Sequence, residues 1–168
     1  TIAVPTGRSE LERMVDIDGD PVLQDDMIYV ATYQGQLAAV SRSSGDVIWR
    51  RKLSSYAGLG ADHRNLYVSD AEDKVWAIDP KNSSSLWKQS KLHGRKLSAP
   101  AVLGEYVVVG DFEGYLHWMS PEDGSLVGRI RVGDDPITNP PVVSGNVAYV
   151  LGAGGDLAAI SISGGASR

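Results

Sequence analysis

The densest run of carboxylates in the sequence is Asp16-Ile17-Asp18-Gly19-Asp20, and its spacing imitates the start of a calcium-binding EF-hand loop. Such a loop needs glycine at its sixth position and a bidentate glutamate at its twelfth. Here these positions hold Pro21 and Met27, and a strand-like run follows where a helix is required. We therefore predict no metal site at this run.

A glycine-rich segment, Gly152-Ala153-Gly154-Gly155-Asp156, could be taken for a loop that cradles a phosphate. That chemistry needs a helix N-terminus directly after the loop, to supply aligned N–H groups. The following residues, Leu157 to Ile162, have the pattern of a strand. The segment is therefore predicted to be a hairpin turn, and no cofactor is expected.

The residue types and their positions give little support for nucleophilic or acid–base catalysis. The chain has no cysteine, which removes thiol catalysis, thiolate metal sites and disulfides together. Its three histidines fall in different settings: His63 in a turn, His93 in a loop, and His117 inside a strand-like run. No shared site follows from these positions, so we predict that the protein is not an enzyme.

The elements that position these residues follow from an internal repeat, seen in two landmark strings per copy that keep the same register. The offsets between copies are 38, 41 and 41 residues. The first landmark is Ile28-Tyr29-Val30, Leu66-Tyr67-Val68, Val107-Val108-Val109 and Ala148-Tyr149-Val150. The second is Leu37-Ala38-Ala39-Val40, Val75-Trp76-Ala77-Ile78, Leu116-His117-Trp118-Met119 and Leu157-Ala158-Ala159-Ile160. Four copies of one unit therefore fill most of the chain.

Each copy reads as four short antiparallel strands separated by Gly, Asp, Asn and Ser turns. The second and third strands are apolar at consecutive positions, which indicates that both of their faces are covered. Four-stranded sheets with a period near 40 residues are typical of the blades of a β-propeller, so the predicted fold is all-β with about four blades. The predicted blades span 20–53, 57–90, 98–132 and 138–163.

Residues outside these blades suggest a larger ring. Residues 1–5 resemble the last strand of a preceding blade, and residues 6–19 form an insertion that breaks the repeat. We predict half of a larger ring, stabilised by the missing N-terminal half or by self-association. On its own, such a segment would leave the apolar faces of its first and last blades exposed to water.

Charge and hydropathy exclude two kinds of partner. Sixteen basic and 21 acidic residues give a formal charge of −5, and no cluster of Lys and Arg follows a phosphate backbone, so no nucleic acid is expected. No apolar run reaches the roughly 18 to 20 residues that cross a bilayer. Any membrane anchor is therefore expected outside this segment.

Two sets of residues carry a family resemblance. The spacings from Ala39 to Trp49 and from Ala77 to Trp87 resemble the tryptophan-docking repeat of PQQ-like propellers. In such repeats the tryptophan packs between adjacent blades, and its indole N–H can reach a loop carbonyl. The stretches 7–18 and 108–118 resemble the BamB family, lipoproteins of the outer-membrane β-barrel assembly (BAM) machinery, and the match extends over the whole chain as the family's C-terminal half.

The resemblance implies an eight-bladed ring and a non-catalytic scaffold subunit that assists the insertion of outer-membrane proteins. It implies a place on the periplasmic face of the outer membrane, held by a lipid anchor outside this segment. The implied partners are the periplasmic domains of BamA, and unfolded outer-membrane proteins are possible clients. The alternative is a quinoprotein-type, PQQ-dependent enzyme subunit or an extracellular sensor built on the same repeat.

The resemblance places the partner-binding residues in the insertion. Asp16 and Asp18 match the acidic pair with which the family engages BamA, and in an extended backbone they would point the same way. Ser9 and Glu12 form a capping box, so a short helix is expected from Glu10 that carries Arg13 and Met14 outward. Direct contact is one reading of the acidic pair. The other is a structural one, in which the carboxylates accept backbone N–H groups of the loop.

Overall fold

The computed structural model describes residues 19–32 and 35–162, which form fifteen β-strands and no helix. Accordingly, this part of the chain contains no helix that could cross a membrane. The strands form four consecutive antiparallel sheets, one for each copy of the repeat. The all-β prediction and the repeat register are therefore confirmed.

Each sheet follows the order of its strands along the chain, so every connection inside a sheet is a hairpin. The first sheet contains β1 (Val22–Gln24), β2 (Met27–Thr32), β3 (Gln36–Ser41) and β4 (Val47–Lys52). The second contains β5 (Leu59–Ala61), β6 (Leu66–Ser69), β7 (Val75–Ile78) and β8 (Ser85–Gln89). The third contains β9 (Ala101–Leu103), β10 (Tyr106–Gly110), β11 (Tyr115–Met119) and β12 (Leu126–Arg131). The fourth contains β13 (Val142–Ser144), β14 (Val147–Leu151) and β15 (Leu157–Ser161).

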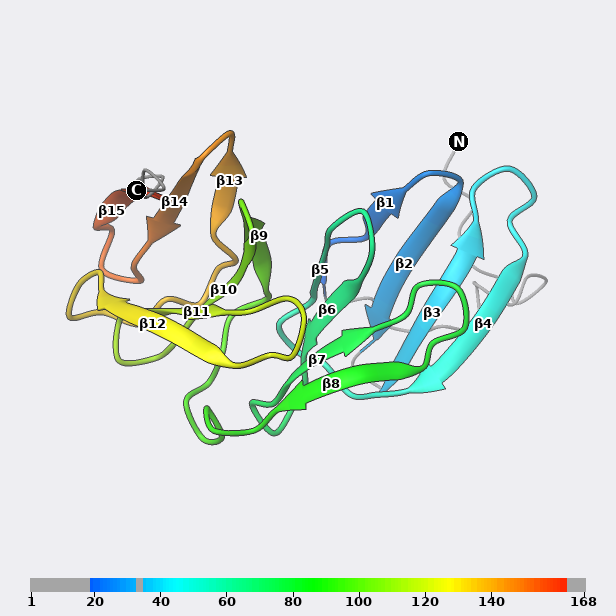
Figure 1. The fold of residues 1–168 in the computed structure, drawn as a ribbon, viewed down its shortest axis with the longest axis horizontal. Coiled ribbons are helices and arrows are strands. Elements are labelled where there is room, and N and C mark those ends of the chain that lie inside the picture. Colours follow the sequence, from blue (N-terminus) through cyan, green and yellow to red (C-terminus); the bar gives the residue numbers. More distant parts are fainter. Residues whose placement is uncertain (1–18, 33–34, 163–168) are drawn as a thin grey trace, which may run out of the picture.

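The first strands of successive sheets lie beside one another: β1 contacts β5, β5 contacts β9, and β9 contacts β13. The later strands of each sheet fan outward from this line (Figure 1). The approach is close at Gly60, because a Cβ there would lie 2.2 Å from the carbonyl oxygen of Pro100. Glycine is therefore required where β5 meets the entry to β9.

The hydrophobic core lies between sheets rather than inside one. One cluster joins the first and second sheets, a second joins the second and third, and a third joins the third and fourth. This explains the unbroken apolar runs of the second and third strands, since a strand in a middle sheet has a neighbour on each side. β6, for example, is buried at every position.

The fourth sheet shows what happens without a following sheet. Leu37, Val75 and Leu116 occupy one repeat position on the face toward the next sheet, and all three are 0% exposed. Leu157 occupies the same position in β15 and is 69% exposed. Tyr149 is likewise 41% exposed, so the prediction of an exposed apolar face is confirmed for the last sheet.

The prediction of an exposed apolar face is wrong for the second and third strands of the first sheet, although Leu23 in β1 is 58% exposed. Val30, Ala38 and Val40 are each 3% exposed or less. The two end sheets therefore differ: the first is buried on both faces of β3, and the fourth presents one apolar face to solvent.

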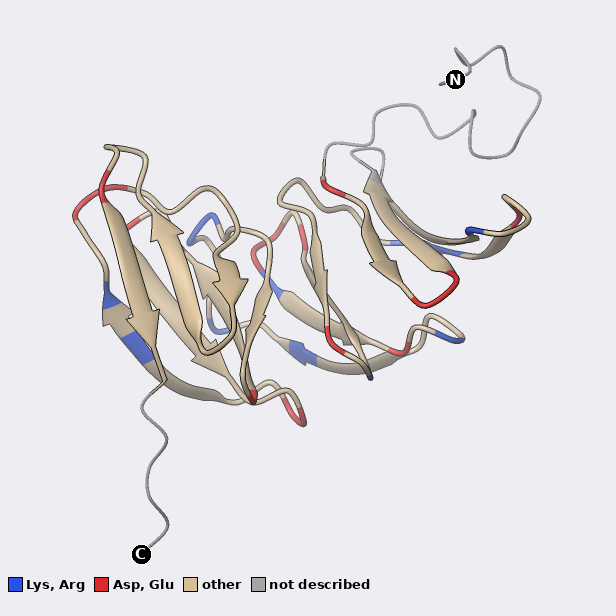
Figure 2. Cartoon of the chain, turned by 90° about the horizontal axis from the view of Figure 1, so that it is seen from above, with Lys and Arg blue, Asp and Glu red and all other residues tan. Residues whose placement is uncertain are grey.

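Charge is distributed by position in the sheet. Among the described residues no Asp or Glu lies in a strand, and all of them lie in turns and connections (Figure 2). Every Lys or Arg inside a described strand lies on an outermost strand, β4, β8 or β12. Basic side chains on outermost strands oppose edge-to-edge aggregation, because like charges repel a second edge.

The repeat position shared by Leu116 and Leu157 gives a matched test of inter-sheet packing. We expect Leu116→Ala to lower the free energy of unfolding by about 2–5 kcal/mol, because it leaves a cavity between two sheets. Leu157→Ala in the 168-residue chain should change it by less than about 0.5 kcal/mol, as for other exposed positions. Urea unfolding of the two variants measures the difference, and equal losses would contradict the inter-sheet account.

Candidate functional site

The residues predicted to bind a partner, Arg13, Met14, Asp16 and Asp18, lie outside the described residues, as does the helix expected from Glu10. Their roles therefore stay predictions. The described chain resumes at Gly19, directly after the acidic pair. A Cβ at Gly19 would lie 2.8 Å from Cα of Gly58, so the end of the insertion meets the chain leading into β5 at close range.

Tryptophans connect the first three sheets, as the repeat predicts. Trp49 Nε1 in β4 donates to the carbonyl oxygen of Pro80 at 2.8 Å, and Trp87 Nε1 in β8 donates to that of Pro121 at 2.8 Å. In each case the acceptor is in the turn after the third strand of the next sheet. The prediction that the indole reaches a loop carbonyl is confirmed. In β12 the same position holds Gly128.

A second inter-sheet contact lies two residues after each tryptophan. Arg51 Nη1 donates to the carbonyl oxygen of Ser83 at 2.6 Å, and Gln89 Nε2 donates to that of Gly124 at 2.7 Å. The Arg51 guanidinium also lies over the Trp76 ring, 5.3 Å from its centroid. Reasoning from the sequence missed this contact, although Arg51 and Gln89 hold the same register after their tryptophans.

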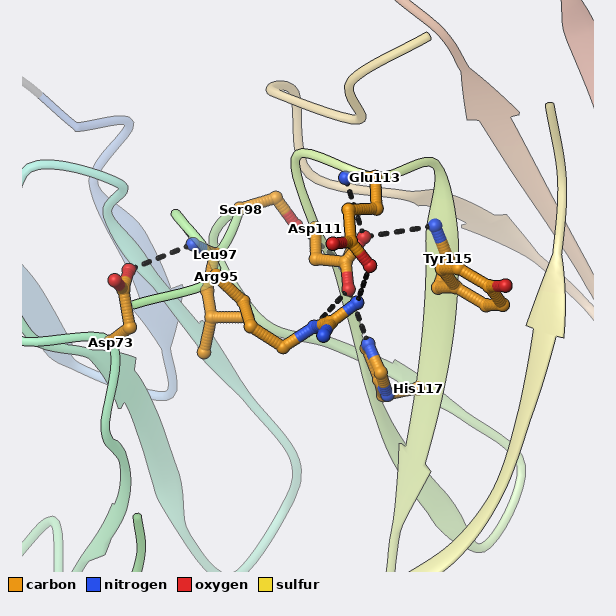
Figure 3. Close-up of polar contacts among 9 residues, drawn as sticks. Asp73, Arg95, Leu97, Ser98, Asp111, Glu113, Tyr115 and His117 are labelled. Atoms are coloured by element: carbon orange, nitrogen blue, oxygen red, sulfur yellow. Dashed lines mark hydrogen bonds and ion pairs between the residues drawn. The ribbon is translucent and has the colours of Figure 1, made fainter. Parts of the chain in front are cut away.

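The third sheet contains a fully buried carboxylate, Asp111, directly after β10 (Figure 3). Its Oδ2 accepts hydrogen bonds from Arg95 Nε at 2.5 Å and from His117 Nε2 at 2.7 Å. Its Oδ1 accepts the backbone N–H groups of Glu113 and Tyr115 at 2.9 and 3.0 Å. Each carboxylate oxygen therefore has two donors.

These donors decide the ionisation of Asp111. Burial alone raises the pKa of this carboxyl, but the hydrogen bonds from His117, the Tyr115 backbone and Arg95 outweigh burial and hold the pKa below its usual range. The carboxylate is ionised at neutral pH. His117 Nε2 therefore carries the proton that it shares with Asp111.

This pair corrects the view of His117 as an isolated histidine, because the sequence analysis did not identify Asp111 as its acidic partner. The preceding sheet shows what the pair does. Asp70 follows β6 at the position equivalent to Asp111, and its Oδ2 accepts Trp76 Nε1 at 2.6 Å. Trp76 and His117 occupy the same position in the third strand, and tryptophan cannot titrate at neutral pH.

The shared contact therefore connects the turn after the second strand to the third strand. Its role is structural. The sequence contained a signal for it. The two copies with Asp after the second strand have an N–H donor six residues later, whereas the copies with Thr32 and Gly152 at that position have Ala38 and Ala158. A search for paired changes between copies would have found it.

The other candidate residues stay apart. His63 is in the turn between β5 and β6, whereas His93 Nδ1 lies 2.6 Å from the carbonyl oxygen of Glu72. In the described part of the chain, no three His, Asp or Glu side chains are placed to hold a metal ion. The run from Gly152 forms a hairpin turn, with Gly155 at φ +98° and β15 following, so the predicted turn is confirmed.

Comparison with known proteins places this arrangement in a family. The model of the family described as outer membrane protein assembly factor BamB matches residues 1–89 and 86–168. The chain belongs to the BamB family. Proteins with that name from Pseudomonas aeruginosa and Alkalilimnicola ehrlichii are 48% and 45% identical to it over 161 residues, which is 96% of this chain. The chain spans 42% of the length of each of these relatives.

Solved structures agree on the propeller fold. The crystal structure of BamB from Moraxella catarrhalis matches with a TM-score of 0.82 and 29% identity, over 94% of this chain and 46% of that one. A quinohemoprotein alcohol dehydrogenase from Comamonas testosteroni matches with a TM-score of 0.66 and 17% identity, over 80% of this chain and 28% of that one. At that identity the likeness to the dehydrogenase shows the fold alone.

Two glycines in the turn after the third strand test the tryptophan contact. A Cβ at Gly124 would lie 2.4 Å from Cε3 of Trp87, whereas a Cβ at Gly45 meets nothing within 4 Å, and φ is positive at both, +71° and +79°. Gly45→Ala should cost about 1–2 kcal/mol for the left-handed backbone alone. Gly124→Ala should cost about 1–3 kcal/mol more, for overpacking against the indole. Urea unfolding measures both losses.

A change in Trp fluorescence of the folded state is expected only for Gly124→Ala. Equal losses of stability in the two glycine variants would contradict the contact between Gly124 and Trp87.

The lowered pKa of Asp111 leads to a prediction of how the free energy of unfolding depends on pH. Because its pKa is lowered in the folded protein, it stabilises the fold above the unfolded pKa of about 4, and this contribution is lost as the pH falls through the folded value. Asp111→Asn should therefore destabilise the protein at neutral pH and flatten the decline in stability below pH about 4. Denaturant unfolding at several pH values gives the slope. Asp134→Asn, at a side chain that is 90% exposed, should leave the slope unchanged.

Proposed function

We propose that the chain is part of a non-catalytic scaffold subunit of the outer-membrane β-barrel assembly machinery, on the periplasmic face of the outer membrane. The observation that carries the proposal is the match of the BamB family model over the whole chain, together with relatives named outer membrane protein assembly factor BamB.

The proposed partner is the periplasmic region of BamA, contacted by the insertion through Asp16, Asp18, Arg13 and Met14. The close approach of Gly19 and Gly58 supports this, because it fixes one end of the insertion against the propeller. A loop attached to a rigid scaffold loses little conformational entropy on binding, and such loops commonly carry recognition. The acidic pair supplies charge and Met14 supplies apolar contact.

Unfolded outer-membrane proteins are the proposed clients. An extended client segment would add to an outermost strand by main-chain hydrogen bonding, since these strands end their sheets. Client binding that persists when prolines block β4, β8 and β12 would rule this mode out.

We further propose that another blade of the same protein covers the exposed face of the fourth sheet, as part of a larger ring. Leu157 and Tyr149 support this, because the equivalent residues of the other sheets are buried by the sheet that follows. In the full-length protein, Leu157→Ala should then cost as much as Leu116→Ala. A negligible cost there, in a monomer, would contradict the ring.

The BamA contact is tested by pulling down BamA periplasmic domains with the full-length protein. Asp16→Ala combined with Asp18→Ala should reduce recovery about tenfold, the order expected for the loss of two charge pairs at an interface. Glu105→Ala combined with Glu122→Ala makes the same change in charge at two exposed turns and should leave recovery unchanged. Unchanged recovery for the Asp16 and Asp18 variant, with an intact melting curve, would reject the site.

A further inference from the structure

A groove of about 400 Å³ lies between the connection from β8 to β9 and the outer part of the third sheet. The connection contributes Lys91, Leu92 and Arg95, and the third sheet contributes His117 from β11 and the run 126–129 from β12. The groove is therefore bounded by two separate elements. It is open to solvent along β12, where every residue is exposed.

Every formally charged residue that lines this groove is basic. Arg95 is neutralised, because it pairs with the buried Asp111 and with Glu113. Among the described residues, no ion pair involves Lys91 or Arg129. Two cations without an ion-pair partner therefore face one groove.

An aromatic ring holds the arginines in place. The guanidinium carbons of Arg95, Arg129 and Arg131 lie 5.8, 5.0 and 5.7 Å from the centroid of the Tyr115 ring. Tyr115 pairs with Arg131 across β11 and β12, and His117 pairs with Arg129, so these side chains share one face of the sheet. A guanidinium stacked on a ring keeps its N–H groups, which lie in the plane of the guanidinium, available to a ligand.

The equivalent groove between the first and second sheets is different. It is lined by Asp70 and Glu72 as well as by Lys52 and Lys74, so its charges are mixed. There Arg51 lies over Trp76 and donates to the next turn. In the basic groove, His117 replaces Trp76. Asp111 and Glu113 hold the repeat positions of Asp70 and Glu72, but both pair with Arg95, and Asp111 is fully buried. Lys91 and Arg129 are therefore left as the cations of this groove without an ion-pair partner among the described residues.

We propose that this basic groove binds an extended acidic polypeptide segment that lies along β12. β12 is the outermost strand of its sheet, so one side of its backbone has no partner strand within the sheet. Side chains two residues apart on an added strand point the same way, which matches the spacing of Arg129 and Arg131 on one face. Arg129 is the more available of the two, because Arg131 pairs with the exposed Asp134 at 2.8 Å. The apolar side chain of Val127, which is 53% exposed, gives contact area beside the charges.

A carboxylate ligand fits better than an isolated phosphate. Arginine binds carboxylates through two parallel N–H groups, and the cations here are spread along a strand edge rather than converging on one point. The proposal narrows the strand-addition mode proposed above to one strand, β12, and to acidic ligands, and it needs no contact with BamA. Its outcome is therefore independent of the test on Asp16 and Asp18.

The test measures binding of fluorescent peptides to the full-length protein by anisotropy. Peptides of alternating Glu and Val, Gln and Val, or Lys and Val share length and strand propensity. We expect the Glu peptide to bind, to bind more weakly as salt increases, and to bind at least tenfold more tightly than the other two, as the loss of two charge pairs would give.

Lys91→Gln combined with Arg129→Gln should weaken the Glu peptide about tenfold. Lys52→Gln combined with Lys81→Gln removes the same charge elsewhere and should not. Both variants change only exposed residues, so we expect their melting curves to match that of the unmodified protein. Such a match would show that both variants are folded. Equal binding of the Glu and Gln peptides, equal loss in both variants, or full competition by inorganic phosphate at equal concentration would each overturn the proposal.

Discussion

Packing of one sheet against the next is the interaction on which the rest of this structure depends. No sheet has a core of its own, and each apolar cluster contains residues from two sheets. The tryptophan contacts at Pro80 and Pro121 reinforce these interfaces at the outer edge. The same constraint explains the fourth sheet, whose apolar face is exposed because no described sheet follows it.

The positions of the charged side chains follow from that constraint. Because strand interiors are apolar on both faces, acidic side chains are confined to turns, and basic ones within strands to outermost positions. Asp111 is the exception in burial, and it is tolerated because Arg95, His117 and two backbone N–H groups satisfy its oxygens. A surface that is acidic at its loops and basic at its outer strands can bind partners of opposite charge at different places.

The proposed contact with BamA and the groove beside β12 involve different residues. The BamA proposal uses the insertion, whereas the groove combines β12 with the connection from β8 to β9, and one of its residues, His117, departs from the repeat by standing in place of Trp76. Repeat proteins commonly acquire function in this way, because one blade can change while inter-sheet packing preserves the ring.

The sequence alone determined the repeat, the strand order within each sheet and the docking role of Trp49 and Trp87, because these follow from local patterns that recur at a fixed spacing. Only the tertiary structure decided that Asp111 and His117 pair, that Val30 and Val40 are buried in the first sheet, and that Lys91 faces Arg129 across a groove. These depend on which side chains meet between separate segments. A one-dimensional period cannot show that, because burial and charge compensation are properties of neighbours in space.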